Sequence, residues 1–114
     1  DVETTVLKVP GTLFQRTDDG YLTNLYTLEF VNKTFEPLKL NVQVVEPSIA
    51  ELILPEGAEI VVPPEGLLKR MALVRIPAAS LVGPRTTVVL GVYQGSSRLE
   101  IVRAKFIGPV KSTR

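Results

Sequence analysis

The stretch YLTNLYTLEFVNKT, from Tyr21 to Thr34, constrains the fold more than any other part of the chain. Aromatic and β-branched residues with a period of two are typical of a half-buried strand. Alternation places Tyr26, Leu28 and Phe30 on one row and Thr27 and Glu29 on the other. We therefore predict a long strand whose first row points into the protein and whose second row faces away.

Shorter runs of valine, leucine, isoleucine and threonine fill the rest of the chain, with nine prolines and eight glycines between them. Such a mixture indicates an all-β domain with short strands. Pro10-Gly11 interrupts the first strand, as in the split first strand of many immunoglobulin-like sandwiches, and Thr17-Asp18-Asp19-Gly20 is a turn signal. We expect extended segments at 3–9, 12–16, 21–32, 38–45, 49–54, 58–62, 67–76, 85–93 and 98–107, and one helical turn within 78–82.

Alternation also predicts the inward rows of the later strands. In 67–76 two phases compete, and we favour Ala72, Val74 and Ile76 inside because Lys69 and Arg75 then face outward. In 98–107 the apolar pattern changes phase, which predicts a β-bulge near Ile101-Val102. The two faces of that strand are predicted to be Leu99 and Ile101 on one side, and Val102, Ala104 and Phe106 on the other. The inward row of 38–45 is predicted to be Leu38, Leu40, Val42 and Val44.

Seven to eight strands at this spacing match an immunoglobulin-like Greek-key β-sandwich, which is the fold class that we predict. The length suits a single domain with one core. We expect residues 1–109 to form the sandwich and 110–114 to be a flexible C-terminal tail after Gly108-Pro109. Because the chain begins at Asp1 without methionine, we also expect it to be a piece of a longer protein. No signal peptide is visible, and no apolar run approaches the ~20 residues of a membrane span.

The chain has no cysteine and no histidine, and this excludes many kinds of catalytic and metal-binding site. Histidine is the usual general base and the commonest transition-metal ligand, and cysteine supplies disulfides and thiolate metal sites. The net charge of +1, with scattered basic residues, leaves no electrostatic footprint for nucleic acid. We therefore expect a domain that is not an enzyme and has no catalytic, cofactor-binding or metal-binding residues. Its binding residues stay unknown from sequence.

Two polar patterns each have a functional and a structural interpretation. Asp18 and Asp19, with Glu29 or Glu36, suggest calcium ligands, but we favour a hairpin turn for Asp-Asp-Gly. Asn32-Lys33-Thr34 fits the N-glycosylation sequon, but we favour an asparagine that bonds its own backbone at a strand end. Four acids beside proline-rich turns are expected to be solvated loop charges: Glu51, Glu56, Glu59 and Glu65.

Six basic residues on later strands suggest a stripe toward anionic lipid or an acidic partner: Lys69, Arg70, Arg75, Arg98, Arg103 and Lys105. Ordinary edge and surface protection is the interpretation that we favour. Tyr21, Tyr26 and Tyr93 could stack a ligand, although tyrosines on such strands more often pack in the core or at its rim. Ser80, Ser96 and Ser97 lack the histidine that would activate a nucleophile.

Several motifs together resemble the C-terminal domain of the FixG (CcoG) type of cytochrome c oxidase accessory protein. That domain has a short opening that contains arginine and glycine, an acidic-glycine turn, Asn-x-Tyr, Asn-Lys-Thr and an ending near Phe-Ile-Gly-Pro. The corresponding residues are Leu13-Phe14-Gln15-Arg16, Asp18-Asp19-Gly20, Asn24-Leu25-Tyr26, Asn32-Lys33-Thr34 and Phe106 to Pro109. The resemblance covers both ends of the chain.

The resemblance implies an immunoglobulin-like sandwich attached to a membrane protein. The upstream part of that parent would carry transmembrane helices and iron–sulfur clusters, and the parent would help to assemble cbb3-type oxidases. The domain would lie on the periplasmic side of the bacterial inner membrane and contact the parent, oxidase subunits or assembly factors. The alternative is a structural or adhesive module of a cell-surface protein. A sugar- or peptide-binding module is a third hypothesis, supported only by the tyrosines.

Overall fold

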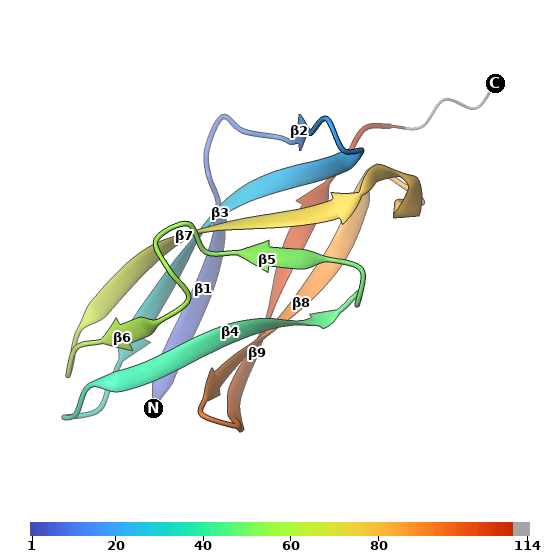
Figure 1. Cartoon of the computed structure of the whole chain (residues 1–114). Coiled ribbons are helices and arrows are strands. Elements are labelled where there is room, and N and C mark those ends of the chain that lie inside the picture. The colour runs from blue at the N-terminus through green and yellow to red at the C-terminus, as the bar shows by residue number, and fades with distance from the viewer. Residues whose placement is uncertain (111–114) are drawn as a thin grey trace.

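Residues 1–110 are described by the computed structural model, and they form nine strands and one short 3₁₀ helix (Figure 1). The strands are β1 Val2–Lys8, β2 Gln15–Arg16, β3 Tyr21–Asn32, β4 Leu38–Glu46, β5 Glu51–Ile53, β6 Ile60–Val62, β7 Leu67–Pro77, β8 Arg85–Gln94 and β9 Ser97–Ile107. The 3₁₀ helix, Ala78–Ser80, lies between β7 and β8, within the segment where a helical turn was predicted.

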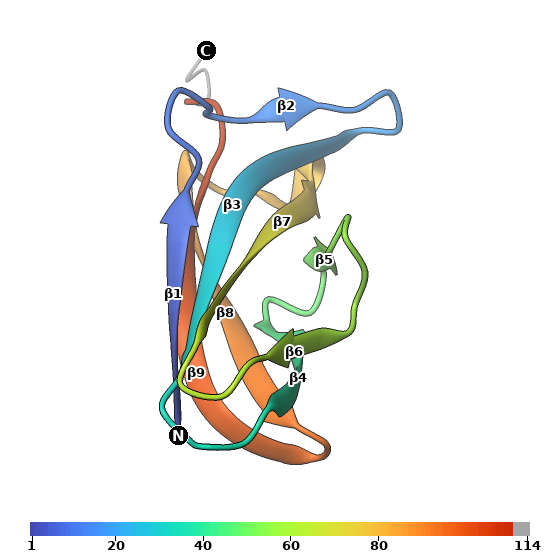
Figure 2. The same ribbon diagram turned by 90° about the vertical axis from the view of Figure 1, so that its left-hand side faces the viewer.

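The strands make two antiparallel sheets that face each other, as Figure 2 shows edge-on. Sheet A has the order β1–β3–β7–β5, and β2 also pairs with β3. Sheet B has the order β6–β4–β8–β9. This arrangement confirms the predicted all-β sandwich. None of the described residues belongs to a helix long and apolar enough to cross a membrane.

The long strand β3 has the burial pattern that its sequence predicts. Buried and half-buried residues alternate along its whole length, and Tyr26, Leu28 and Phe30 are each at most 2% exposed. Burying a large apolar side chain of this kind contributes roughly 1.5–3 kcal/mol. Asn24 and Asn32 lie on the same buried row. The core of the sandwich is therefore built around one row of β3 that is mostly, but not wholly, apolar.

The first strand is split as the sequence predicts. β1 pairs with β3 with Val6 opposite Leu28, and β2 pairs with the beginning of the same strand, with Gln15 opposite Thr23. Between them, Gly11 has a φ of 79°, which favours glycine because it has no Cβ. The extended segment expected at 12–16 is reduced to the two residues of β2.

The phase predicted for β7 is correct, because Ala72, Val74 and Ile76 are buried and Met71 is 45% exposed. The predicted row of β4 also faces inward: Leu38 and Leu40 are buried, and Val42 and Val44 pack against the core at its edge.

The bulge predicted near Ile101-Val102 is wrong in position. The pairing of β8 and β9 passes from Val92 opposite Glu100 to Tyr93 opposite Arg98, which leaves Leu99 as the extra residue. One phase then runs through the rest of β9, so Ile101 is 39% exposed on the outer side. The apolar Leu99 and Ile101 are surface residues, and the residue that shares the inward row with Val102 is the charged Glu100.

The two lateral sides of the sandwich differ. On one side β1 of sheet A lies beside β9 of sheet B, and the backbone N–H of Thr4 donates to Oε2 of Glu100 at 3.1 Å (Figure 2). On the other side the chain passes from β5 in sheet A to β6 in sheet B. The predicted tail, 110–114, falls outside the described residues except for Val110.

Candidate functional site

The Asn-x-Tyr motif on β3 joins the two sheets through the core. Asn24 Nδ2 donates to the carbonyl oxygen of Ile107 at 2.9 Å, and Asn24 Oδ1 accepts from the N–H of the same residue at 2.8 Å. The side-chain amide thus satisfies both polar backbone groups of the last residue of β9. Since a buried backbone group without a partner is costly, this asparagine is a structural requirement at the end of sheet B.

Tyr26 makes a second connection of the same kind. Its hydroxyl donates to the carbonyl oxygen of Lys105 at 2.6 Å and lies 3.4 Å from Oδ1 of Asn24. Burial raises the pKa of the Tyr26 hydroxyl, so the group stays protonated and remains a donor. This tyrosine is part of the core, as favoured from sequence.

The sequon asparagine is also structural. Asn32 is 1% exposed, and its Oδ1 accepts from the N–H of Thr34 at 2.9 Å and from the Thr34 hydroxyl at 2.7 Å. Its Nδ2 donates to the carbonyl oxygen of Glu36 at 2.8 Å and also lies 3.2 Å from that of Val62. These contacts confirm the interpretation as an asparagine that bonds nearby backbone, and they bury the nitrogen that a glycan would need.

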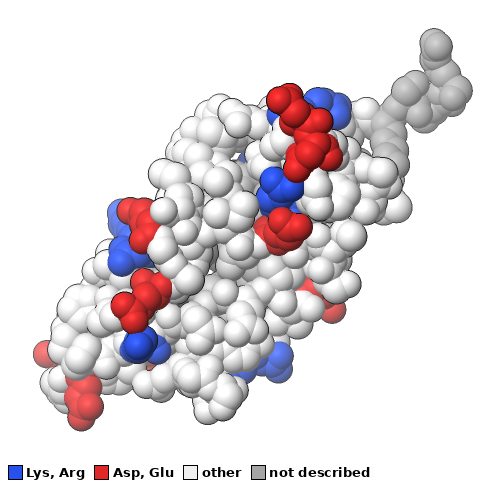
Figure 3. Space-filling model, viewed as in Figure 1, with Lys and Arg blue, Asp and Glu red and all other residues white. Residues whose placement is uncertain are grey.

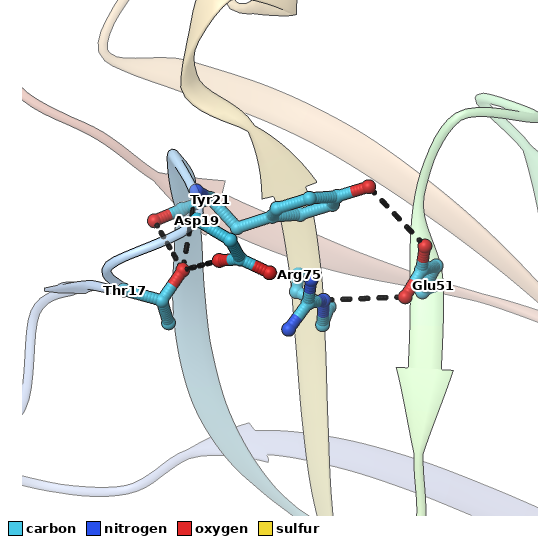
Figure 4. Close-up of polar contacts among 5 residues, drawn as sticks. All are labelled: Thr17, Asp19, Tyr21, Glu51 and Arg75. Carbon is cyan, nitrogen blue, oxygen red and sulfur yellow. Dashed lines mark hydrogen bonds and ion pairs between the residues drawn. The ribbon is translucent and has the colours of Figure 1, made fainter.

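Around Arg75, on the outer side of sheet A, five side chains form what we call the Arg75 cluster: Thr17, Asp19, Tyr21, Glu51 and Arg75 (Figure 4). Arg75 donates to Oδ2 of Asp19 at 2.9 Å and forms an ion pair with Oε1 of Glu51 at 3.2 Å. Its guanidinium lies 3.8 Å from the centroid of the Tyr21 ring. The Tyr21 hydroxyl donates to Oε2 of Glu51 at 3.5 Å. The cluster therefore connects the turn before β3 and the edge strand β5 to the middle of the sheet.

The charges in the Arg75 cluster reinforce one another. Hydrogen bonds from the Thr17 hydroxyl and then from Arg75 lower the pKa of the Asp19 carboxyl. The hydrogen bond to Asp19 raises the pKa of Arg75. A cation held between two carboxylates has no charge left for an external anion, so we assign the cluster to stability of the sheet.

Two of the four acids considered as calcium ligands form ion pairs. Asp19 belongs to the Arg75 cluster, and Glu29 pairs with Lys69 at 3.6 Å. Thr17 and Gly20 close the predicted turn, because the Gly20 N–H donates to the Thr17 carbonyl at 3.2 Å. No group of three or more potential metal-ligating acids is found within residues 1–110.

Two of the expected loop charges make specific contacts. Glu56 Oε1 accepts from the N–H of Met71 at 3.0 Å, and Glu59 pairs with Lys39 at 3.1 Å. With Glu51 in the Arg75 cluster, the description of all four loop acids as simply solvated is too broad, although each is exposed.

The six basic residues do not form one stripe, because the two sheets separate them. Lys69, Arg70 and Arg75 lie on β7, and the other three lie on β9. On the side shown in Figure 3, basic and acidic groups mostly lie next to one another, which agrees with the ion pairs of Lys69 and Arg75. Arg70 is half-buried on the inward row of β7, and its side chain donates to the carbonyl oxygen of Lys69 at 3.2 Å.

The outer side of β8 and β9 carries the remaining cations, and we call it the basic face: Arg85, Arg98, Arg103 and Lys105, with Tyr93 and Ile101. Val88, Leu90 and Val92 fill the inner row of β8, so residues between them face outward. Sequence analysis missed Arg85 as a member, although the alternation of β8 would have placed it there. Within residues 1–110, none of the four cations has an ion pair.

Tyr93 reaches over Gly91 on the basic face. A Cβ added to Gly91 would come within 2.6 Å of the Tyr93 ring, so the ring occupies the space that a side chain at 91 would need. Gly91 is opposite Ile101 on one side and Gln43 on the other. This tyrosine is therefore a surface residue supported by the sheet, which is the rim position considered from sequence.

A hollow of about 260 Å³ lies on the other side of the molecule, between residues 11–15 and the outer surface of sheet A. Thr23 and Leu25 on β3 and Leu73 on β7 line its floor. No charged or titratable side chain lines it, so it offers no group for acid–base chemistry. The serines considered from sequence lie elsewhere: Ser80 ends the 3₁₀ helix, Ser96 is in the β8–β9 turn, and Ser97 begins β9.

Comparison with known proteins gives one match to a family. A family model described as "IG-like fold at C-terminal of FixG, putative oxidoreductase" matches residues 1–109. A search of curated proteins gave no match.

Two solved structures are similar to this chain to different degrees. The crystal structure of a FixG-related protein from Vibrio parahaemolyticus is 22% identical, with a TM-score of 0.76 over 93% of this chain and 94% of that chain. The structure of WR4, an MSP family member of C. elegans, is 10% identical, with a TM-score of 0.48 over 93% of this chain and 97% of that chain. At this identity the first likeness supports the fold alone.

Proposed function

The chain belongs to the family of immunoglobulin-like domains found at the C-terminus of FixG, and on this premise we propose that it is a non-catalytic accessory domain. In this proposal the parent is a membrane-bound iron–sulfur protein that takes part in assembling cbb3-type cytochrome c oxidase. The domain lies on the periplasmic side of the inner membrane and acts through contacts with the parent, oxidase subunits or assembly factors. The observation that carries the proposal is the family match, which spans almost the whole chain.

The metal groups that the family implies do not fit the donor set of this chain. Iron–sulfur clusters are held by cysteine thiolates, and copper(I) prefers thiolate or thioether ligands. The chain has no cysteine, no histidine and a single methionine, Met71. The clusters therefore belong to the upstream part of the parent in this proposal, and no redox step is assigned to these residues.

A small sandwich without catalytic groups can still act through its shape, its strand edges and its surface. Its loops and strand edges can dock a partner without any change in the core. The match over residues 1–109 favours this role within a FixG-type parent over the alternative of a separate adhesive module.

Deleting the domain from its parent tests the proposal. The parent without residues 1–114 should insert into the membrane and keep its iron–sulfur clusters, measured by their absorbance and EPR signals, while oxidase assembly falls. A parent that carries Thr27→Ala on the outer row of β3 is the matched control and should assemble oxidase normally. Loss of the clusters with normal insertion would contradict the proposal, because the domain would then shape the redox site itself.

A further inference from the structure

The basic face has an unusual distribution of charge. Residues 85–107 contain four cations, Arg85, Arg98, Arg103 and Lys105, and a single acid, Glu100. Glu100 lies on the inward row of β9 and accepts the backbone N–H of Thr4. The only acid of the hairpin is thus turned away from the basic face and used to bind β1. As a result, the outer side of β8 and β9 presents cations without acids of its own.

The cations on the outer side of sheet A behave differently, whereas Arg16 and the inward-row Arg70 of the same sheet have no ion pair within the described residues either. Lys33, Lys69 and Arg75 each have a carboxylate partner, at distances of 2.8, 3.6 and 2.9 Å.

Charges that only keep a sheet surface soluble and prevent it from pairing with other chains can be paired with acids, as they are on sheet A. Such a role would therefore not require unpaired cations on β8 and β9. Glu46 on the neighbouring β4, opposite Val89, is exposed but has no ion pair with these cations within the described residues. The difference favours carboxylates of another molecule as the complement of the basic face.

Apolar and aromatic residues lie between these cations on the basic face. Ile101 is 39% and Leu99 is 41% exposed, and the end of the Tyr93 ring lies over Gly91. Tyrosine and arginine are enriched among the residues that dominate protein–protein binding, and flat apolar ground between them suits a protein surface. Three of the four cations are arginines, whose planar fork binds carboxylates through two hydrogen bonds.

A protein partner fits this face better than a lipid surface does. Proteins that lie on membranes bury an exposed apolar element in the headgroup region. Here the exposed apolar residues are on the strands themselves and none projects from the end of the hairpin. The turn that joins β8 and β9 is Gln94-Gly95-Ser96-Ser97, which has no large apolar side chain.

We propose that the basic face binds an acidic surface of a partner protein. Carboxylates of the partner lie opposite Arg103 and Lys105, and apolar side chains of the partner pack on Ile101 and Tyr93. This inference rests on the proposed function, because it takes protein contact as the role of the domain and assigns that contact to one side of the sandwich.

Binding to a defined acidic polypeptide tests the charge of the face. The 114-residue chain is titrated with a random copolymer of glutamate and tyrosine, and separately with phosphatidylcholine vesicles that contain phosphatidylglycerol. We expect the copolymer to bind more tightly than the vesicles. We expect the double variant Arg103→Glu/Lys105→Glu to bind the copolymer at least about tenfold more weakly. In the variant, negative charges at positions 103 and 105 would face and repel the glutamates of the copolymer.

A second double variant controls for net charge. Arg16→Glu/Lys69→Glu lowers the net charge by the same amount, but both positions lie in sheet A. It should change copolymer binding by no more than about twofold. Equal weakening by the two double variants, absence of copolymer binding, or tighter binding to the vesicles would each overturn the inference.

Photo-crosslinking in the membrane-bound parent separates this inference from the proposed function. A photoreactive residue replaces either Ile101, 39% exposed on the basic face, or Met71, 45% exposed on sheet A. We expect a crosslink from position 101 to an acidic segment of another protein, and its loss with Arg103→Glu/Lys105→Glu. A crosslink from position 71 alone would overturn the choice of face while the accessory function stands. Absence of a crosslink from both positions would contradict both proposals.

Discussion

The outer side of sheet A and the basic face use charge in opposite ways. On sheet A, Arg75 lies between Asp19 and Glu51 and over the Tyr21 ring, and Lys69 pairs with Glu29. On the basic face, the cations of β8 and β9 have no ion pair within the described residues, and Glu100 faces the interior. Both surfaces cover the same core. The net charge of +1 therefore does not reveal that cations on the outer side of sheet A are paired with acids while those of the basic face are not.

The largest effect should come from the interior that both surfaces share. Leu28→Ala or Phe30→Ala removes a side chain that is at most 1% exposed, and should lower the free energy of unfolding by roughly 2–5 kcal/mol. Thr27→Ala, on the half-buried outer row of the same strand, should cost no more than about 1 kcal/mol. Urea denaturation measures all three. A greater loss for Thr27→Ala would show that the inward and outward rows are reversed.

A somewhat smaller loss is expected at the connection between the sheets. Asn24→Ala leaves the N–H and the carbonyl of Ile107 without their partners, and should lower the free energy of unfolding by about 2–4 kcal/mol. Hydrogen exchange of the Ile107 amide should speed up with it. Slow exchange of this amide in the variant would mean that another group can replace Asn24, and that the end of β9 does not depend on sheet A.

The Arg75 cluster should show its contribution as a dependence on pH. The folded-state pKa of Asp19 is depressed below its ordinary 3.8, so its stabilising effect is present above that value and disappears as the pH falls through the lower, folded-state pKa. The melting temperature of the wild type should therefore approach that of Asp19→Asn as the pH falls below about 4. Thermal melts of both proteins across this range check the prediction. A difference between them that is independent of pH would mean that Asp19 acts without its charge.

The smallest effect on stability is expected where the structure leaves charges unpaired. Arg103→Glu/Lys105→Glu should change the free energy of unfolding by no more than about 0.5 kcal/mol, because both side chains are exposed and neither has an ion pair within residues 1–110. Urea denaturation beside the binding titration would then show normal stability with weakened binding. A clear loss of stability would contradict the comparison, because the cations of the basic face would then stabilise the fold as those of sheet A do.

The sequence predicted most of the strands and their phases because periodicity reports burial directly. The rows of β3 and β7 are as expected, and so is the split of the first strand by Pro10-Gly11. Where the prediction failed, in β9, the sequence violates the usual rule that apolar residues point inward. Leu99 and Ile101 are exposed while Glu100 faces the interior, and a pattern of hydrophobicity cannot show such an exchange.

The resemblance to FixG rested on motifs whose roles turn out to be structural. Asn24 and Tyr26 bond to the backbone of β9, far away in the chain, and Asn32 holds the turn that follows β3. Their sequence spacing marks the family but does not reveal these partners. Sequence reasoning also left the binding residues unknown, because the cations of the basic face are scattered over more than twenty positions and alternate with core residues.

The sequence by itself determined the strands, the inward rows, the all-β class and the lack of thiolate and imidazole ligands, since each of these follows from residue identity and local spacing. Only the tertiary structure decided which charges are paired. Arg75 meets Asp19 and Glu51 because β2–β3, β5 and β7 converge in one sheet. Arg103 pairs with no acid among residues 1–110, and Glu100 lies on the opposite side of the same strand. Charge pairing depends on distances of a few ångströms between residues far apart in the chain, and packing of the two sheets sets those distances.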